Sequence, residues 1–193
     1  RILASRGAGF VTVEEVVAGV RPLRAARRKI TPPAGALDLC GTGGDGHNTF
    51  NISTAPAFVV AACGVPVAKH GNRGASSRSG TADVLEELGV KIDMEPVAAE
   101  ACLAETHFCF LFAPHYHTAM KHVAPVRKQL GFRTIFNLLG PLSNPAQVKR
   151  QLIGVFSPDW IETLAHVLKE LGSQKAWLVH GADGLDELTT TAA

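Results

Sequence analysis

The sequence predicts an α/β fold in which a mainly parallel sheet is flanked by helices, with a smaller helical domain beside it. Continuous apolar strands alternate with helices along most of the chain, which is typical of a parallel sheet covered on both faces. One long stretch, residues 114–142, breaks this alternation and has a helical pattern. The 193 residues are 46% hydrophobic and 19% charged, which indicates a globular chain long enough for one packed domain, or for one domain and part of another.

The first predicted element is an amphipathic helix over residues 12–29, which Pro22 is expected to break or kink. The segment TPPAG, residues 31–35, follows as a turn. Short apolar runs then predict strands over residues 36–40, 65–69, 108–112, 151–156 and 175–180. The connecting helices are predicted over residues 53–63, 81–88, 96–106 and 159–171, and glycines 64 and 89 close the first two.

Residues 114–142 are predicted to contain a helix over 118–130 and a short helix over 135–139. We expect them to pack with the N-terminal helix in a separate helical layer. The predicted domains are residues 1–30 (part of an N-terminal helical domain), 34–113 (first part of the α/β domain), 114–145 (helical insertion) and 146–193 (the α/β domain continued, incomplete). The chain begins at Arg1 and ends soon after a turn-like GADG, so we expect it to be truncated at both ends.

Composition excludes several classes of protein. A net charge of +2 is too small to indicate nucleic-acid binding. The basic cluster Arg24, Arg27, Arg28 and Lys29 is interpreted as a solvated helix end that the helix dipole favours. The sequence has no long uncharged apolar segment, so no membrane span is expected. The four cysteines form no CxxC pair, which favours buried free thiols in a reducing compartment, and we expect a cytoplasmic protein.

The stretch Leu37 to Asn51, LDLCGTGGDGHNTFN, is the most informative part of the chain. A buried strand runs into a glycine-rich loop, Gly41–Gly46, and a helix follows. Glycines let backbone N–H groups approach an anion, and a helix N-terminus adds donors and a favourable dipole, so the pattern predicts a phosphate site. The loop fits neither a P-loop nor a dinucleotide fingerprint. Asp45 is unexpected there unless a metal ion or a ribose is nearby.

Two further polar clusters follow strands or open helices. The segment NIST (51–54) opens the first helix, where simple N-capping by Ser53 or Thr54 is an equally good explanation. The segment 69–80, KHGNRGASSRSG, combines three cations, three serines and an asparagine, which favours phosphate binding over an ordinary surface loop. Ser79 is also a candidate N-cap for the helix that begins at Thr81.

A third cluster, DGLDE (183–187), follows the strand that ends at His180. Adjacent carboxylates suit Mg²⁺, although an ordinary acidic turn would explain this cluster taken alone. His115, His117 and His122 lack a zinc spacing, so structural or substrate contacts are favoured. Arg127 and Arg133 border an apolar segment and could reach a carboxylate ligand, although solvation is the default for an arginine.

Six motifs in order resemble the anthranilate phosphoribosyltransferase family of the tryptophan pathway. They are GTGGD (41–45), NIST (51–54), KHGNR (69–73), SSRSGTADVLEELG (76–89), VRKQLGFRTIFNLLGPLSNP (126–145) and DGLDE (183–187). The resemblance implies a small helical domain, an α/β domain of the nucleoside-phosphorylase type, and a homodimer joined through the helical domain. It also implies that the family's chain is longer than this one at both ends.

The reaction that the resemblance implies is displacement of pyrophosphate from C1 of 5-phosphoribosyl 1-pyrophosphate (PRPP) by the amine of anthranilate, with Mg²⁺ as cofactor. An aromatic amine is neutral near pH 7, so a strong general base is not required, and no residue is assigned as a catalytic acid or base. Positioning and electrostatics would then do most of the work, with Lys69 and Arg127 the most important residues.

The resemblance also assigns residues to ligands. Arg127 is implied to meet the anthranilate carboxylate, with Gly41, Asn72, His70 and His117 also near anthranilate, whereas Arg133 is not given this role. Ser53, Asp186 and Glu187 match metal-binding positions. The PRPP set is Gly41, Gly44, Asp45, Thr49, Asn51, Ile52, Ser53, Thr54, Lys69, His70, Gly71, Asn72, Arg73, Gly74, Ala75, Ser76, Ser77 and Thr81.

Three alternatives remain open at this point. A pyrimidine-nucleoside phosphorylase of the same fold would use inorganic phosphate and should lack the segment that carries Arg127. A nucleic-acid-binding relative without activity should have lost Asp186 and Glu187 and gained a basic face. An inactive truncated fragment is the third. We expect neither nucleic acid nor membrane as a partner.

Overall fold

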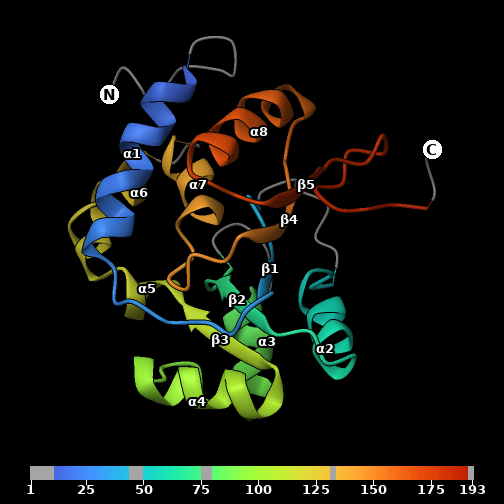
Figure 1. The fold of residues 1–193 in the computed structure, drawn as a ribbon. Helices are drawn as coiled ribbons and strands as arrows, with labels where there is room; N and C mark the ends of the chain where they lie inside the picture. The colour runs from blue at the N-terminus through green and yellow to red at the C-terminus, as the bar shows by residue number, and fades with distance from the viewer. Residues whose placement is uncertain (1–10, 44–49, 75–79, 131–133, 191–193) are drawn as a thin grey trace.

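The sheet is parallel throughout and lies at the centre of the molecule (Figure 1). The computed structural model describes residues 11–43, 50–74, 80–130 and 134–190, except for the side chain of Lys128. In this part of the chain the strands are β1 (Leu37–Gly41), β2 (Val67–Gly71), β3 (Phe108–Phe112), β4 (Arg150–Gly154) and β5 (Lys175–Val179). Their order is β3-β2-β1-β4-β5, which confirms the predicted fold class.

Most predicted strands lie within one or two residues of the observed ones, and β2 differs for a clear reason. It was expected over 65–69 but begins at Val67. Val65 donates its N–H to the Val60 carbonyl at 3.3 Å and so completes the end of the preceding helix. Pro66 has no N–H to donate and only accepts, from Leu37 N at 2.9 Å.

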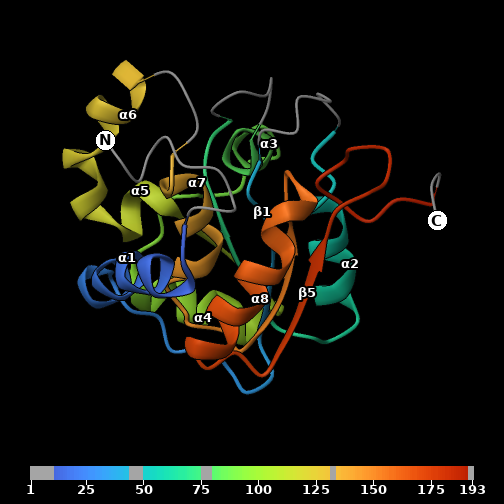
Figure 2. The same ribbon diagram turned by 90° about the horizontal axis from the view of Figure 1, so that it is seen from above.

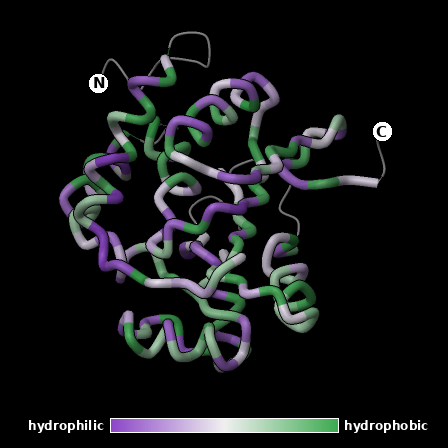
Figure 3. The backbone as a smooth tube through the Cα atoms, in the orientation of Figure 1, coloured by the Kyte–Doolittle hydropathy of each residue, from purple (hydrophilic) through white to green (hydrophobic). Residues whose placement is uncertain are grey.

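Helices cover both faces of the sheet, as predicted. On one face, α2 (Thr54–Ala62) packs on Leu39 and Val67, and α3 (Thr81–Glu87) packs on Phe110. On the other face, α4 (Pro96–Thr106) packs on Ala68 and Leu111, and α8 (Ile161–Glu170) packs near Cys40 and Ile153. Hydrophobic residues run almost all along α2 (Figure 3); Ala57 and Ala61 pack on the sheet, whereas Val59 is 64% exposed.

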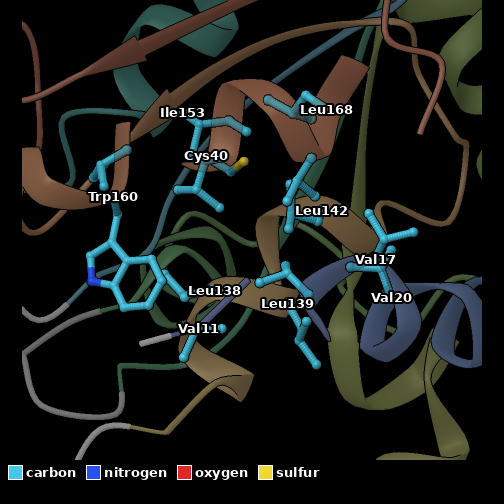
Figure 4. Close-up of a cluster of buried hydrophobic side chains, with 14 residues drawn as sticks. Val11, Val17, Val20, Cys40, Leu138, Leu139, Leu142, Ile153, Trp160 and Leu168 are labelled. Carbon is cyan, nitrogen blue, oxygen red and sulfur yellow. The ribbon is translucent and has the colours of Figure 1, made fainter. Parts of the chain in front are cut away.

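Helix α1 (Val13–Ala26) joins the largest apolar cluster. Thr12 and Glu15 form a capping box at its start. Val17 and Val20 then face Leu139 and Leu142 (Figure 4). Of the break or kink expected at Pro22, the break is wrong, because α1 continues through this residue, and the helix ends at Ala26 rather than at 29. It stops where Arg27 becomes extended and the N–H of Arg28 donates to the Tyr116 carbonyl at 2.9 Å.

Residues 113–143 form short helices rather than the long one expected over 118–130. They are α5 (Ala113–Tyr116), a 3₁₀ turn at Thr118–His122, α6 (Ala124–Leu130), α7 (Phe136–Leu139) and a 3₁₀ turn at Pro141–Ser143. Pro125 explains the interruption, since it has no N–H to donate to the preceding turn. Figure 1 and Figure 2 place α5, α6 and α7 on the side where α1 lies, and α1 contacts α7. The predicted domain boundaries stay a prediction.

All four cysteines are free, as expected, although Cys63 at the end of α2 is exposed rather than buried. Within the described residues, no helix is both long enough and apolar enough to cross a membrane.

Candidate functional site

The carboxyl ends of β1 and β4 bring the glycine loop and the acidic cluster together. From β1 the chain adds β2 and β3 on one side and then β4 and β5 on the other, so β1 and β4 flank the point where the strand order reverses, which is where ligands bind in open α/β sheets. The N–H of Gly43 donates to Asp186 Oδ2 at 3.1 Å, across 143 residues of sequence. Gly43 has a φ of 67°, which favours glycine. A Cβ at Gly154 would lie 1.6 Å from the Asp186 carbonyl oxygen, so the acidic segment crosses directly over the end of β4.

Lys69 is the buried cation of this site. Its side chain is 1% exposed, and Nζ donates to the Leu39 carbonyl at 2.5 Å and to Ser53 Oγ at 3.0 Å. Burial lowers the pKa of Lys69, while the negative charges of Asp38 and Glu187 oppose this shift, Asp38 most strongly. The structure therefore joins three predicted residues, Lys69, Ser53 and Glu187, in one electrostatic environment.

Asp38, a residue that sequence reasoning missed, is the main counter-charge to Lys69. It is fully buried, and its carboxylate accepts the N–H of His70 at 3.0 Å and Asn144 Nδ2 at 2.8 Å. Asn144 also donates to the Ala68 carbonyl at 2.8 Å. Burial raises the pKa of Asp38, while Lys69 and these hydrogen bonds act against the shift. A charged residue inside the apolar run LDLC was the signal that could have identified it.

The start of α2 differs from the simple N-cap that was one explanation of the NIST motif. Ser53 has helical backbone angles and makes no capping bond; its hydroxyl accepts from Lys69 instead. The N–H groups of Thr54 and Ala55 donate to the Asn51 carbonyl at 3.2 and 3.4 Å. The sequence suggested that this helix end offers free backbone N–H groups. The N–H groups of Thr54 and Ala55 are instead used within the chain, so the side-chain hydroxyls are the main polar groups there.

Thr81 lies next to this helix start. The Thr54 hydroxyl donates to Asn51 Oδ1, and its oxygen lies 3.3 Å from Thr81 Oγ1, within hydrogen-bond distance. Both threonines are buried. The start of α3, which follows the KHGNR segment, is thereby fixed against the start of α2. Ser79, the other N-cap candidate, lies outside the described residues, and Gly80 occupies the N-cap position.

His70 and His117 come together from β2 and from the turn after α5. Their ring centroids are 5.1 Å apart, and each residue is 6% exposed. Burial lowers the pKa of both, that of His70 to about 3, so both rings are neutral near pH 7. Each Nε2 is buried without a hydrogen-bond partner within the described part of the chain. Neutral imidazoles with an unused nitrogen suit a polar aromatic ligand better than a charged one.

Arg127 lies in α6 with its guanidinium 5.6 Å from the centre of the Phe136 ring. It is partly buried, and the burial lowers its pKa. No carboxylate of residues 11–43, 50–74, 80–130 or 134–190 forms an ion pair with it. A desolvated guanidinium above an aromatic ring is suited to bind a carboxylate, because planar guanidinium groups pair with carboxylates in two parallel hydrogen bonds.

Arg73 has carboxylate partners that the sequence did not reveal. Its guanidinium pairs with Asp83 at 3.0 Å and with Glu86, and lies over the Phe112 ring. These partners raise the pKa of Arg73 and already balance its charge. Several other predicted ligand residues lie outside the described residues. They are Gly44, Asp45, Thr49, Ala75, Ser76 and Ser77, and Arg133 is outside as well.

Asp186, Glu187 and Ser53 offer hard oxygen ligands of the kind that Mg²⁺ takes. Asp186 sits at the Gly43 turn, and Glu187 acts electrostatically on Lys69, which contacts Ser53. No group of three or more His, Cys, Asp or Glu side chains gathers as a metal site within the described residues. Two carboxylates are nevertheless enough for Mg²⁺, which commonly completes its shell with water and substrate phosphates. The donor set therefore fits this ion.

A hollow of about 390 Å³ lies elsewhere, lined by Arg21, Arg24, Arg27, Lys29 and Glu170 among others. Arg24 Nε donates to the Leu142 carbonyl at 2.8 Å, and Arg27 Nε donates to that of Pro145 at 3.0 Å. The predicted solvated helix end is therefore wrong for these two arginines. They are partly buried because they bind the ends of other segments, which gives the basic cluster a structural role.

The fold and the strand-end site define a glycosyl transferase domain. The chain belongs to the family described as "Glycosyl transferase family, a/b domain", whose model matches residues 33–193. It is 60% identical over 179 residues to anthranilate phosphoribosyltransferase of Chelativorans sp. (strain BNC1). The aligned residues cover 93% of this chain and 53% of the relative. The enzyme of the same name from Rhodospirillum rubrum is 59% identical over 180 residues, covering 93% and 52%.

Solved structures show the same similarity. Anthranilate phosphoribosyltransferase from Thermus thermophilus superposes with a TM-score of 0.83 at 47% identity, over 92% of this chain and 54% of that one. The Saccharomyces cerevisiae enzyme in complex with PRPP and Mg gives 0.84 at 34% identity, over 92% and 50%. The resemblance predicted from the motifs is confirmed. The chain spans about half the length of the curated relatives it matches.

Proposed function

We propose that the protein transfers the phosphoribosyl group of PRPP to the amine of anthranilate, giving N-(5-phosphoribosyl)anthranilate and pyrophosphate, in tryptophan biosynthesis. The observation that carries this proposal is the hydrogen bond of Gly43 to Asp186 at the ends of β1 and β4, together with the charge of Glu187 acting on Lys69, which is bonded to Ser53. The names of the relatives support it, and so does the yeast structure with PRPP and Mg.

In this proposal the protein acts on the leaving pyrophosphate mainly through charge and position. The Lys69 ammonium and the hydroxyls of Ser53 and Thr54 would hold its oxygens near the strand ends. As negative charge grows on the leaving group, these preorganised donors stabilise it without having to reorganise. Mg²⁺ held by Asp186, Glu187 and Ser53 would supply further neutralisation when bound. The anthranilate amine is neutral, so it needs no strong base to attack C1.

Arg127 would receive the anthranilate carboxylate. Its desolvated guanidinium gains most from an anionic partner, because charge pairs are stronger where water is excluded. His70 and His117 would face the ring of the ligand as neutral groups, since burial keeps their pKa values low. We also propose the Asn72 contact to anthranilate, Mg²⁺ as cofactor, a cytoplasmic location and a homodimer through the helical domain, all of which follow from the family resemblance.

The test is a fluorescence assay of the purified protein with anthranilate, PRPP and Mg²⁺. We expect anthranilate to be consumed only when both PRPP and Mg²⁺ are present. Asp186→Asn with Glu187→Gln should abolish the metal dependence and most of the rate, whereas Glu162→Gln, an exposed carboxylate on α8, should change neither. No metal-dependent loss of anthranilate, or phosphorolysis of a pyrimidine nucleoside in its place, would refute the proposal.

A further inference from the structure

Asp83 in α3 connects the end of the KHGNR segment to Gly80, the residue directly before α3. Its Oδ2 accepts the N–H of Gly74 at 3.0 Å and the N–H of Gly80 at 2.8 Å. Its Oδ1 accepts from Arg73 Nη1 at 3.0 Å. One carboxylate therefore holds residues 73–74 and residue 80 in a fixed relation. These hydrogen bonds lower the pKa of Asp83, so the side chain is ionised near pH 7.

The two pieces of chain are packed tightly against each other. The N–H of Ala82 donates to the Asn72 carbonyl at 3.2 Å, next to the bonds that Asp83 makes. A Cβ at Gly80 would lie 2.1 Å from Gly74 N and 2.4 Å from the Arg73 carbonyl carbon. Backbone thus meets backbone here, and residues 72–74 cannot move without breaking contacts to the start of α3.

We propose that Asp83 is a positioning residue for PRPP binding, which it serves by fixing the main chain of Asn72–Gly74; this inference rests on the proposed function. Both oxygens of Asp83 are occupied by the chain itself, and a carboxylate would repel a phosphate, so it does not contact the substrate. It acts through Asn72 and Gly74, which belong to the proposed PRPP site. The backbone of this segment must be held still before substrate arrives, because a misplaced donor loses most of its value.

Helix capping alone does not explain the arrangement. At the third position of α3, Asp83 needs only the bond to Gly80 N to complete a capping box. The second bond goes to Gly74, nine residues earlier, and adds nothing to the helix. Arg73 is oriented by the same carboxylate, but Glu86 also holds it. The structure thus offers a matched control, since Glu86 shares Arg73 with Asp83 but is not the residue that binds Gly74 and Gly80.

The experiment compares the steady-state kinetics of Asp83→Ala, Asp83→Asn and Glu86→Gln. Asp83→Ala removes all three bonds and should raise the KM for PRPP at least tenfold, while kcat per folded enzyme and the KM for anthranilate change less than threefold. Asp83→Asn keeps an oxygen for the two glycine N–H groups and should largely restore the KM. Glu86→Gln should stay within threefold of wild type. Hydrogen exchange of the Gly74 amide should accelerate in Asp83→Ala only.

A purely stabilising role predicts a different result, namely a smaller active fraction with an unchanged KM for PRPP. That result would overturn the inference, and so would equal effects of Asp83→Ala and Glu86→Gln. If Asp83→Ala does not fold, Asp83→Glu keeps the charge and the Arg73 pair but displaces the glycine contacts, so it should raise the same KM. Wild-type protein that is inactive with PRPP contradicts the proposed function itself, whereas an active wild type with an insensitive Asp83 contradicts only this inference.

Discussion

Replacing Asp38 should be among the most destabilising single changes in this chain. The substitution Asp38→Asn keeps the side-chain volume but removes the charge that balances Lys69, which is 1% exposed. In the wild type the two carboxylate oxygens accept from His70 N and Asn144 Nδ2. In the variant an NH₂ group takes the place of one oxygen and faces one of these two donors. A buried donor left facing another donor costs roughly 1–3 kcal/mol, and more where a nearby charge loses its counter-charge. We therefore expect the free energy of unfolding to fall by at least about 2 kcal/mol.

The assay is urea unfolding at pH 7, followed through the two tryptophans. Trp160 is 7% exposed in the main apolar cluster and Trp177 is 55% exposed on β5, so their emission reports different depths of the α/β core. A double-mutant cycle with Lys69→Met isolates the pair, because the double variant leaves neither charge buried alone. We expect the double variant to be more stable than the sum of the single changes predicts, by at least about 1 kcal/mol.

Two results would refute this reasoning. A loss smaller than about 1 kcal/mol for Asp38→Asn would be typical of an exposed carboxylate and would contradict the buried pair. Strict additivity with Lys69→Met would show that the two charges do not interact. The matched control is Asp159→Asn, the same substitution at an exposed helix start. It should change the free energy of unfolding by less than about 0.5 kcal/mol.

Three further predictions concern single residues. Arg127→Ala should raise the KM for anthranilate at least tenfold and leave the KM for PRPP nearly unchanged. Arg127→Lys should give an intermediate KM for anthranilate, because an ammonium lacks the planar guanidinium that pairs with a carboxylate in two hydrogen bonds. Equal effects on the KM values of both substrates would contradict the carboxylate role. Burial holds the pKa of His70 at about 3, below the 6.5 of the unfolded chain, so its stabilising contribution is complete above pH 6.5 and declines as the pH falls towards 3. His70→Gln should therefore reduce the loss of unfolding free energy between pH 6.5 and 5 by up to about 2 kcal/mol, and an unchanged pH slope in urea titrations would rule this out. Arg24→Ala should cost about 1–3 kcal/mol, because it removes the donor to the Leu142 carbonyl, whereas the exposed Arg21→Ala should cost less than about 0.5 kcal/mol; equal melting temperatures of the two variants would argue against the structural role.

The sequence predicted the sheet and most helices because their signals are local. The strand 108–112 and the helix 96–106 have the predicted bounds, since apolar runs between turn residues leave few alternatives. The errors occur where one residue overrides a pattern. Pro125 divides the expected helix over 118–130, while Pro22 is accommodated within α1. The effect of a proline depends on whether neighbouring segments can satisfy the carbonyl that it leaves unpaired, which the sequence does not reveal.

For the site, the sequence indicated the residues that face a ligand better than those that hold them. Lys69, Ser53 and Asp186 come from recognisable motifs; Lys69 contacts Ser53, and Asp186 accepts from Gly43 at the end of β1. Asp38 and Asn144 were missed, because a buried polar residue has no periodic pattern and its partner is 106 residues away. The pairing of His70 with His117 was likewise not predicted from their spacing, although both were named near the aromatic ligand.

Carboxylates that hold the backbone of an anion site pose an electrostatic problem, and the structure shows how it is met. Asp38 accepts from His70 N, Asp83 from Gly74 N and Asp186 from Gly43 N, so each fixes a main-chain segment of the proposed site. Carboxylates suit this role because hydrogen bonds to charged acceptors are the strongest available. Three negative charges near a pyrophosphate would oppose its binding unless they were balanced. Lys69 balances Asp38 and Arg73 balances Asp83 within the protein. In the proposal above, Mg²⁺ would add further positive charge beside Asp186 when it is bound.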